Sequence, residues 1–139
     1  MRRGSTIVEL AVTLGILSIL SAIAIPWMGE ILDRVKVRSA AVEIESLFNA
    51  ARHTAIARAA QATVEIDPAA QSINISVGSD TVRTRKIGAA HDVQISATRA
   101  RMSYSATGMG YGAANLSVVV RRNASVDTVF VSRLGRVRY

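Results

Sequence analysis

The sequence predicts an α+β protein in which a long N-terminal helix, half membrane-compatible and half amphipathic, packs on a small antiparallel β-sheet domain. Three observations lead to this prediction. A run of 20 residues without a charge extends from Leu10 to Gly29. Apolar residues then recur at three- and four-residue spacing up to about Ala60, which is the period of a helix. After residue 60, apolar and polar residues alternate, as they do in half-buried strands.

The uncharged run is long enough to cross the hydrocarbon core of a bilayer as a helix rising about 1.5 Å per residue. A secretory signal peptide is the alternative, because Arg2 and Arg3 give a charged start and the small residues of SAIA offer a cleavage point. Helical periodicity that continues far beyond the run favours a transmembrane helix over residues 5–29. Pro26 should kink this helix, since proline removes one backbone hydrogen bond.

Residues 30–60 are interpreted as the amphipathic continuation of the same helix. Charged residues lie largely on one side of it, and the other side offers cover for one face of a sheet. The apolar positions are Ile31, Leu32, Val35, Ala40, Ile44, Leu47, Phe48, Ala51, Ala55 and Ile56.

Residues 61–139 are expected to form the β-rich globular domain. Pro68 fits a turn and cannot sit in the middle of a strand, so TVEID and SINISV on either side of PAAQ predict a hairpin. The stretch GMGYG, residues 108–112, lacks the lysine of a phosphate-binding loop and is interpreted as a flexible loop. The expected strands are residues 63–67, 72–77, 81–87, 92–97, 116–122 and 126–132, and a turn is expected at residues 88–91.

The composition argues against an enzyme and against a metal or cofactor site. The chain has no cysteine, which excludes disulfides, thiolate zinc sites and thiol nucleophiles. Its two histidines, His53 and His91, are too few for a His-rich metal site, and no nucleophile-elbow pattern is present. We interpret both histidines as ordinary surface residues.

Glu9 is the one charged residue in the segment GSTIVELAVTLGILSILSAIAIP, residues 4–26. A carboxylate at the centre of a membrane helix costs on the order of 3 kcal/mol, less near the interface, and such a residue usually has a partner. Simple exposure at the membrane interface is the alternative explanation.

The segment RRGSTIVEL…AIAIP resembles the amino-terminal segment of type IV pilins and type II secretion pseudopilins, which combine a short basic leader and a long apolar helix with residues matching Gly4, Thr6, Glu9 and Pro26. The resemblance implies that residues 1–4 are a leader. A prepilin peptidase would cut between Gly4 and Ser5 and methylate the new amine of Ser5. Glu9 would then attract the amino terminus of a neighbouring subunit during filament assembly, with Thr6 and Pro26 as the other assembly residues.

The resemblance further implies a single-pass protein of the bacterial inner membrane, with its globular domain in the periplasm, that joins other pilin subunits in a pilus or pseudopilus. Ser5 departs from the pattern, because the family usually has phenylalanine or another large apolar residue there. This departure concerns the efficiency of methylation. A single-pass membrane protein that never polymerises is a further alternative.

The stretch LFNAARHTAIARAAQATVEID also resembles the GspH/FimT-type minor pilins, whose pattern has an Ala-Arg pair, a following Ala and a polar turn into the first strand. Here the pattern is carried by Ala51, Arg52, Ala55 and Arg58. This second resemblance extends the implied fold over the globular domain.

The net charge of +7 is concentrated in the second half of the chain, where residues 67–139 contain ten basic and four acidic side chains. Fifteen of the seventeen cations are arginine, whose guanidinium group binds phosphate bidentately. A polyanionic partner and a solvated basic surface both explain this distribution.

The C-terminal stretch SRLGRVRY gives the basic charge a specific arrangement. Arg136 and Arg138 are two residues apart, which places both guanidinium groups on one face of an extended segment about 7 Å apart, roughly commensurate with neighbouring phosphates. Gly135 permits a turn just before them. A charged edge strand that resists aggregation is the alternative interpretation.

GRVR, residues 135–138, resembles the Gly-Arg-x-Arg motif near the end of FimT-type members, which are linked to DNA binding during natural transformation. The resemblance implies sequence-independent binding of DNA through Gly135, Arg136 and Arg138. Other arginines enlarge this patch if their strands neighbour the last one, namely Arg133, Arg121 and Arg122. The alternative function is that of a minor pseudopilin near the tip of a type II secretion filament, where the arginines contact partner subunits or substrate.

Overall fold

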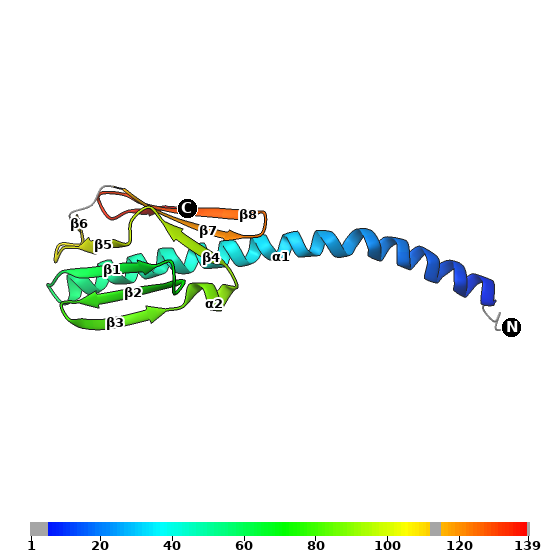
Figure 1. Cartoon of the computed structure of the whole chain (residues 1–139), viewed down its shortest axis with the longest axis horizontal. Coiled ribbons are helices and arrows are strands. Elements are labelled where there is room, and N and C mark those ends of the chain that lie inside the picture. Colours follow the sequence, from blue (N-terminus) through cyan, green and yellow to red (C-terminus); the bar gives the residue numbers. More distant parts are fainter. Residues whose placement is uncertain (1–5, 112–114, 139) are drawn as a thin grey trace. The chain divides into compact units, whose positions relative to one another are not determined.

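The computed structural model describes residues 6–111 and 115–138, with Pro26 described by its backbone (Figure 1). The processing residues Gly4 and Ser5 lie outside the described residues, as does Gly112 of the GMGYG stretch. The chain divides into two compact units, Met1–Leu32 and Asp33–Tyr139. One helix, α1 (Ile7–Ala57), belongs to both units, which confirms the predicted long N-terminal helix.

The first half of α1 exposes its large apolar side chains, with Leu10 59%, Leu20 57% and Trp27 71% exposed. By length and composition it contains a stretch that is able to cross a membrane. The helix continues on both sides of Pro26. The described residues of this unit leave the apolar surface of the helix exposed.

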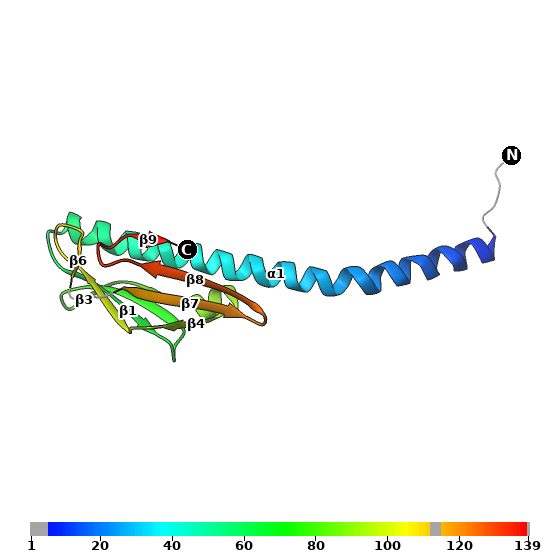
Figure 2. The same cartoon turned by 90° about the horizontal axis from the view of Figure 1, so that it is seen from above.

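The second half of α1 is the centre of the Asp33–Tyr139 unit. Its apolar stripe from Ala40 to Ala55 is buried as the sequence predicts, but Ile31, Leu32, Val35 and Ile56 are at least 47% exposed. The strands of both sheets run along this half of the helix (Figures 1 and 2). The buried side chains of α1 are Val37, Ala40, Ala41, Ile44, Leu47, Phe48, Ala51 and Ala55.

Five strands form the first sheet, in the order β3-β2-β1-β5-β6. The hairpin of β1 and β2 matches the prediction, and its strands pair as far as Asp67 and Ser72. The Asp67 carboxylate closes the turn by accepting hydrogen bonds from the backbone N–H groups of Ala69 and Ala70, at 2.8 and 3.0 Å. The strands are β1 (Ala62–Asp67), β2 (Ser72–Val77), β3 (Asp80–Arg85), β5 (Arg101–Tyr104) and β6 (Gly110–Tyr111).

Four strands form the second sheet, in the order β4-β7-β8-β9, and every neighbouring pair in both sheets is antiparallel. Alternate side chains of this sheet enter the core, for example Val118 and Val120 of β7 and Val129 of β8. The strands are β4 (Gln94–Ala97), β7 (Leu116–Arg122), β8 (Ser125–Val131) and β9 (Val137–Arg138).

The structure corrects several expected elements of the globular domain. The turn expected at residues 88–91 is part of a short helix, α2 (Ile87–His91), whose first residue is buried. Strand β3 therefore ends at Arg85 and not at Ile87. Strand β9 falls on the extended C-terminal segment that the spacing of Arg136 and Arg138 predicts, whereas strands β5 and β6 were not expected from the sequence. They are two to four residues long, too short for a clear alternating pattern.

Tyr104 of β5 is fully buried, and its hydroxyl has no hydrogen-bond partner among the described residues. Burial raises the pKa of Tyr104 to about 12, against a weaker opposing effect of the charge on Arg52. The phenol therefore stays neutral in the folded protein at pH values at which an unfolded chain ionises.

This difference predicts a loss of stability in alkali. The ordinary tyrosine pKa is 10.0. The contribution of Tyr104 to the free energy of unfolding is therefore fully present below about pH 10. It is lost as the pH rises toward 12, because the unfolded chain loses its phenol proton first. The free energy of unfolding falls by about 1.4 kcal/mol for each unit by which the pKa of Tyr104 in the folded protein exceeds that in the unfolded chain. Tyr104→Phe should remove this decline and leave stability at neutral pH unchanged or slightly higher, because a buried unpaired hydroxyl is deleted.

Denaturant unfolding of the detergent-solubilised chain, followed by circular dichroism across this pH range, measures the effect. Tyr111→Phe is the matched control, since Tyr111 is 64% exposed. An alkaline decline in Tyr104→Phe as steep as in the wild type would contradict the prediction.

Candidate functional site

The C-terminal arginines lie on a tight turn followed by a short edge strand. After β8, the Ser132 N–H donates to the Arg136 carbonyl and the Gly135 N–H donates to the Ser132 carbonyl, both at 2.8 Å. The Ser132 hydroxyl also accepts from the Arg136 N–H at 3.0 Å. Strand β9 then pairs with β8, placing Arg138 opposite Phe130. Ser132 thus holds the turn together, a role that the sequence did not indicate.

Gly135 is required in this turn for two reasons. Its φ of +78° lies in the left-handed region that side-chain-bearing residues rarely adopt. A Cβ atom at this position would also lie 2.7 Å from Cε1 of the buried Tyr104 ring. Gly135 therefore acts through its backbone, and the core ring beneath it sets the position of the turn that carries Arg136.

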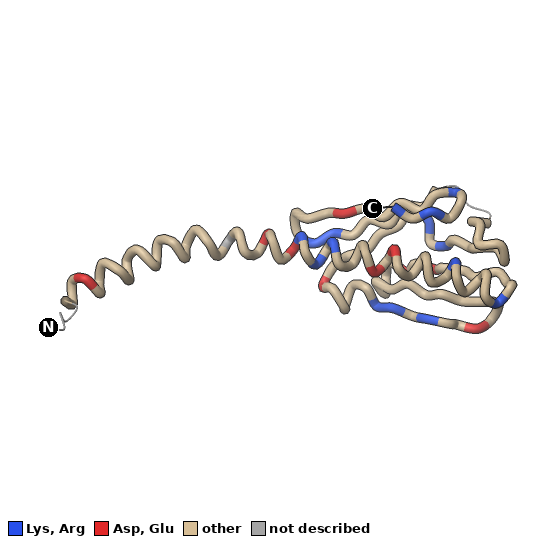
Figure 3. The backbone as a smooth tube through the Cα atoms, turned by 180° about the vertical axis from the view of Figure 1, so that it is seen from behind, with Lys and Arg blue, Asp and Glu red and all other residues tan. Residues whose placement is uncertain are grey.

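The guanidinium groups of Arg133, Arg136 and Arg138 are exposed and form no ion pair or hydrogen bond with a described residue. Some other basic side chains of this unit have acidic partners, as in the pairs Arg38–Asp127 and Arg101–Glu65, while Arg83, Arg99 and Arg121 have no ion pair with a described residue. Figure 3 shows basic positions close to the C-terminal end of the chain. The positive charge of this end is therefore available to a ligand.

Arg136 and Arg138 line one shallow pocket of about 370 Å³. Phe130 and Leu134, each 56% exposed, contribute its apolar surface, and none of the described residues that line it is acidic. Val137, between the two arginines, packs against the core instead. The site thus combines two guanidinium groups, unpaired among the described residues, with an exposed aromatic ring. Sequence reasoning missed the ring, because only the strand pairing brings Phe130 beside Arg138.

The expectation that Arg121 and Arg122 enlarge this patch requires β7 to neighbour β9, and that adjacency is wrong. Strand β8 lies between them. Along β8, Arg121 pairs with Val126, whereas Arg138 pairs with Phe130. Four residues of strand separate the two rows, about 13 Å. Arg121 therefore belongs to another part of the surface.

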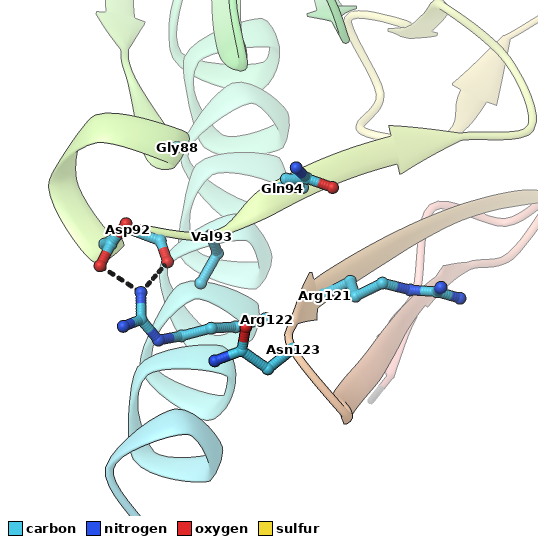
Figure 4. A pocket seen from close by; sticks show the side chains of 7 residues that line it. All are labelled: Gly88, Asp92, Val93, Gln94, Arg121, Arg122 and Asn123. Atoms are coloured by element: carbon cyan, nitrogen blue, oxygen red, sulfur yellow. Dashed lines mark hydrogen bonds and ion pairs between the residues drawn. The ribbon is translucent and has the colours of Figure 1, made fainter. Parts of the chain in front are cut away.

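Arg122 forms ion pairs within the protein that connect β7 to α1 and to the residue after α2. Its Nε lies 2.6 Å from Oδ1 of Asp33 on α1, and its Nη1 pairs with the Asp92 carboxylate after α2. Hydrogen bonds from Asn123 and Arg122 lower the pKa of Asp33, and the hydrogen bond to Asp33 raises the pKa of Arg122. In Figure 4 Arg122 points at Asp92, while Arg121 points away from it.

The two histidines differ in their surroundings. His53 is exposed, as expected. His91 is half-buried and lies with its Nε2 2.5 Å from Oε2 of Glu43, so it joins α2 to α1 and is not an ordinary surface residue. Burial alone would raise the pKa of Glu43, but hydrogen bonds from His91 and Arg85 outweigh it and lower that pKa. Within the described residues, no group of three or more histidine and carboxylate side chains gathers in a way suited to a metal ion.

The described residues 108–111 of the GMGYG stretch form a turn and a short strand, not a flexible loop. Gly108, with a φ of +76°, ends a turn in which its N–H donates to the Ser105 carbonyl at 2.8 Å. Gly110 and Tyr111 form β6 on the edge of the first sheet. A Cβ on Gly110 would lie 2.6 Å from the Arg133 carbonyl oxygen, so this edge packs closely against the C-terminal turn.

At the other end of the chain, Thr6 caps the start of α1. Its hydroxyl oxygen accepts a hydrogen bond from the backbone N–H of Glu9 at 3.2 Å. The spacing of Thr6 and Glu9 is that of a capping box, a signal present in the sequence but not used above. Glu9 is exposed, and its carboxylate lies in the first turn, where the helix dipole favours negative charge.

No protein-family profile matches the chain, and no curated protein matches it. Among solved structures, the chain is similar to the type IV minor pilin FimU of Pseudomonas aeruginosa, with a TM-score of 0.66 and 15% identity over 78% of this chain and 90% of FimU. A second crystal form of FimU gives a TM-score of 0.61 and 14% identity over 73% of this chain and 90% of FimU. The similarity establishes the fold, a long N-terminal helix packed on antiparallel sheet.

The contact between Gly135 and Tyr104 predicts that two glycine substitutions differ in cost. Gly78→Ala introduces a side chain at a φ of +61° into open space, and should cost about 1 kcal/mol of unfolding free energy. Gly135→Ala adds the clash with the Tyr104 ring and should cost about 1 to 3 kcal/mol more. Denaturant unfolding of both variants measures the difference. Equal losses would show that the ring does not constrain the turn.

Proposed function

We propose that this chain is a minor type IV pilin of the GspH/FimT type, which joins a pilus and binds DNA without sequence preference during DNA uptake. The binding surface, here called the C-terminal patch, consists of Arg133, Arg136 and Arg138. The observation that carries the proposal is that Arg136 and Arg138 line one pocket and form no ion pair with any residue that the structure describes. This pocket lies on a fold similar to that of a minor pilin.

The exposed first half of α1 supports the membrane and filament parts of the proposal. Apolar side chains from Ile7 to Leu32 are exposed within the described part of the Met1–Leu32 unit, and a bilayer before assembly or neighbouring subunits after it would cover them. The proposal includes cleavage by a prepilin peptidase between Gly4 and Ser5 and storage in the bacterial inner membrane with the globular unit in the periplasm. Glu9 then meets the free amine of an adjoining subunit, which compensates its charge.

The charge arrangement supports DNA as the ligand of the C-terminal patch. Arginine is suited to phosphate because its planar guanidinium forms paired hydrogen bonds with the oxygens. Contacts to phosphates carry no direct base information, so binding is independent of sequence. Arg122 is not part of this patch, since it is held by Asp33 and Asp92.

A structural role at the tip of a type II secretion pseudopilus is the second candidate. The exposed apolar side chains of Phe130 and Leu134 beside the arginines favour it, because such a surface also suits a protein partner. Gel retardation of duplex DNA by the full chain in detergent at low salt separates the two candidates. A lack of retardation favours the pseudopilin role.

The salt dependence of DNA binding tests the C-terminal patch. If Arg136 and Arg138 each neutralise one phosphate, the double variant Arg136→Ala/Arg138→Ala should reduce the log-log slope of duplex affinity against salt by about two units. Fluorescence anisotropy of a labelled duplex, titrated with the full chain in detergent, measures this slope.

The matched control is Arg83→Ala/Arg99→Ala, which removes the same charge from exposed positions outside the pocket. Its slope should stay closer to that of the wild type. An unchanged slope and affinity in the Arg136/Arg138 variant would refute the assignment.

The assembly part of the proposal is tested at Glu9. Glu9→Ala should lower incorporation into sheared pili at least about tenfold, since losing the partner of a buried charge costs more than the 1.4 kcal/mol that a factor of ten requires. Ser21→Ala is the control, because the Ser21 hydroxyl donates only to the Leu17 carbonyl within α1 among the described residues.

Immunoblots of the pilus and membrane fractions of the native host measure incorporation and confirm that each variant reaches the membrane. Normal amounts of Glu9→Ala in the pili would count against filament assembly through this residue.

A further inference from the structure

We infer that the pocket beside Arg136 and Arg138 holds a base of an unpaired nucleic-acid strand against the ring of Phe130, so that the site binds single-stranded DNA more tightly than duplex. This inference rests on the proposed function and specifies its ligand. It follows from the position of Phe130, which the sequence alone did not single out.

Strand register places the ring and a guanidinium group side by side. Phe130 and Arg138 are direct partners in the β8–β9 pair, so both side chains project from the same face of the sheet. The Cβ atoms of such partners lie about 4.5 to 5.5 Å apart. Phe130 is 56% exposed, and Val129 and Val131 on either side of it are buried in the core. Phe130 is therefore the side chain of its strand segment that faces outward.

The chemistry of the pocket fits one nucleotide of a single strand. Proteins that bind single strands combine a positively charged groove for the backbone with aromatic side chains on which bases stack. Here Phe130 offers the ring, Leu134 extends the apolar surface, and Arg136 and Arg138 lie at the same pocket. The volume of about 370 Å³ is at the low end of the range for small-molecule pockets, which suits a single planar ring system.

A duplex is expected to use only part of this site. Bases in a duplex are stacked on their neighbours and paired along their edges, so one of them reaches the ring only after extrusion, at a cost of a few kcal/mol. The duplex therefore retains the phosphate contacts of the arginines without the stacking contact. An unpaired strand makes both contacts.

Among the lining residues that the structure describes, two are cationic and none is acidic, which favours a polyanion over other partners. A protein segment would have to supply carboxylates for both arginines and an apolar group for Phe130. A nucleotide supplies the phosphate and the ring in one repeating unit, and its stacking is tolerant of sequence.

Substitution at Phe130 separates stacking from charge. Phe130→Leu keeps an apolar side chain and removes the ring, and Phe130→Trp restores a larger one. The control is Val126→Ala, which changes an apolar side chain on the same strand that is 50% exposed and does not line the pocket. The full chain in detergent is titrated against a labelled mixed-sequence single strand and against a duplex of equal length.

Phe130→Leu should weaken single-strand binding on the order of 5- to 150-fold, the range that corresponds to loss of one stacked base. Duplex affinity should change by less than about twofold, because the phosphate contacts remain. Phe130→Trp should retain single-strand affinity, and Val126→Ala should behave as the wild type. Circular dichroism melting of each variant confirms that the fold is intact.

The other outcomes overturn the inference in distinguishable ways. Equal weakening of both probes by Phe130→Leu, or no change with either, rejects the stacking contact. If Arg136→Ala/Arg138→Ala still weakens both probes in that case, the proposed function stands without the inference. If the arginine variant has no effect on either probe, the proposed function fails as well, and a protein partner is the better assignment for the pocket.

Discussion

Packing of two sheets against the second half of α1 is the interaction on which the rest of the globular unit depends. Four of the eight buried helix side chains are alanines, Ala40, Ala41, Ala51 and Ala55, which take up little space between the helix and the sheets. Larger side chains such as Ile44 and Phe48 fill the space between them. With the helix as common support, the two sheets need no continuous hydrogen bonding between them.

Ion pairs then connect the sheets and α2 to the helix, and one aromatic ring positions the C-terminal turn. Arg122 connects β7 to Asp33 on the helix and to Asp92 after α2, while Glu43 connects the helix to Arg85 and His91. At the C-terminal turn, the ring of Tyr104 from the first sheet lies under the turn of the second. The position of the candidate site therefore follows from core packing and does not rest on surface contacts alone.

The predictability of these features from the sequence depends on whether their cause is local. The long helix and the first hairpin were predicted, because periodicity and Pro68 are local signals. Helix α2 and strands β5 and β6 were missed, because they are only two to five residues long and give no clear periodicity, and β5 depends on pairing with β1, far earlier in the chain. The partners of Arg122 are likewise distant in sequence, so its charge was read as free. The spacing of Arg136 and Arg138 predicted the cations of the site, but only the β8–β9 register brings Phe130 to them.

Strand β9 consists of two residues at the edge of its sheet, and it follows the turn at Gly135. Few backbone hydrogen bonds and little of the core depend on the side chains of Arg136 and Arg138, and of the described residues after Gly135 only Val137 packs against the core. The exposed side chains of this segment are thus expected to contribute little to the free energy of unfolding. Substitutions at these terminal positions are therefore expected to change the chemistry of this surface while the fold beneath it stays the same.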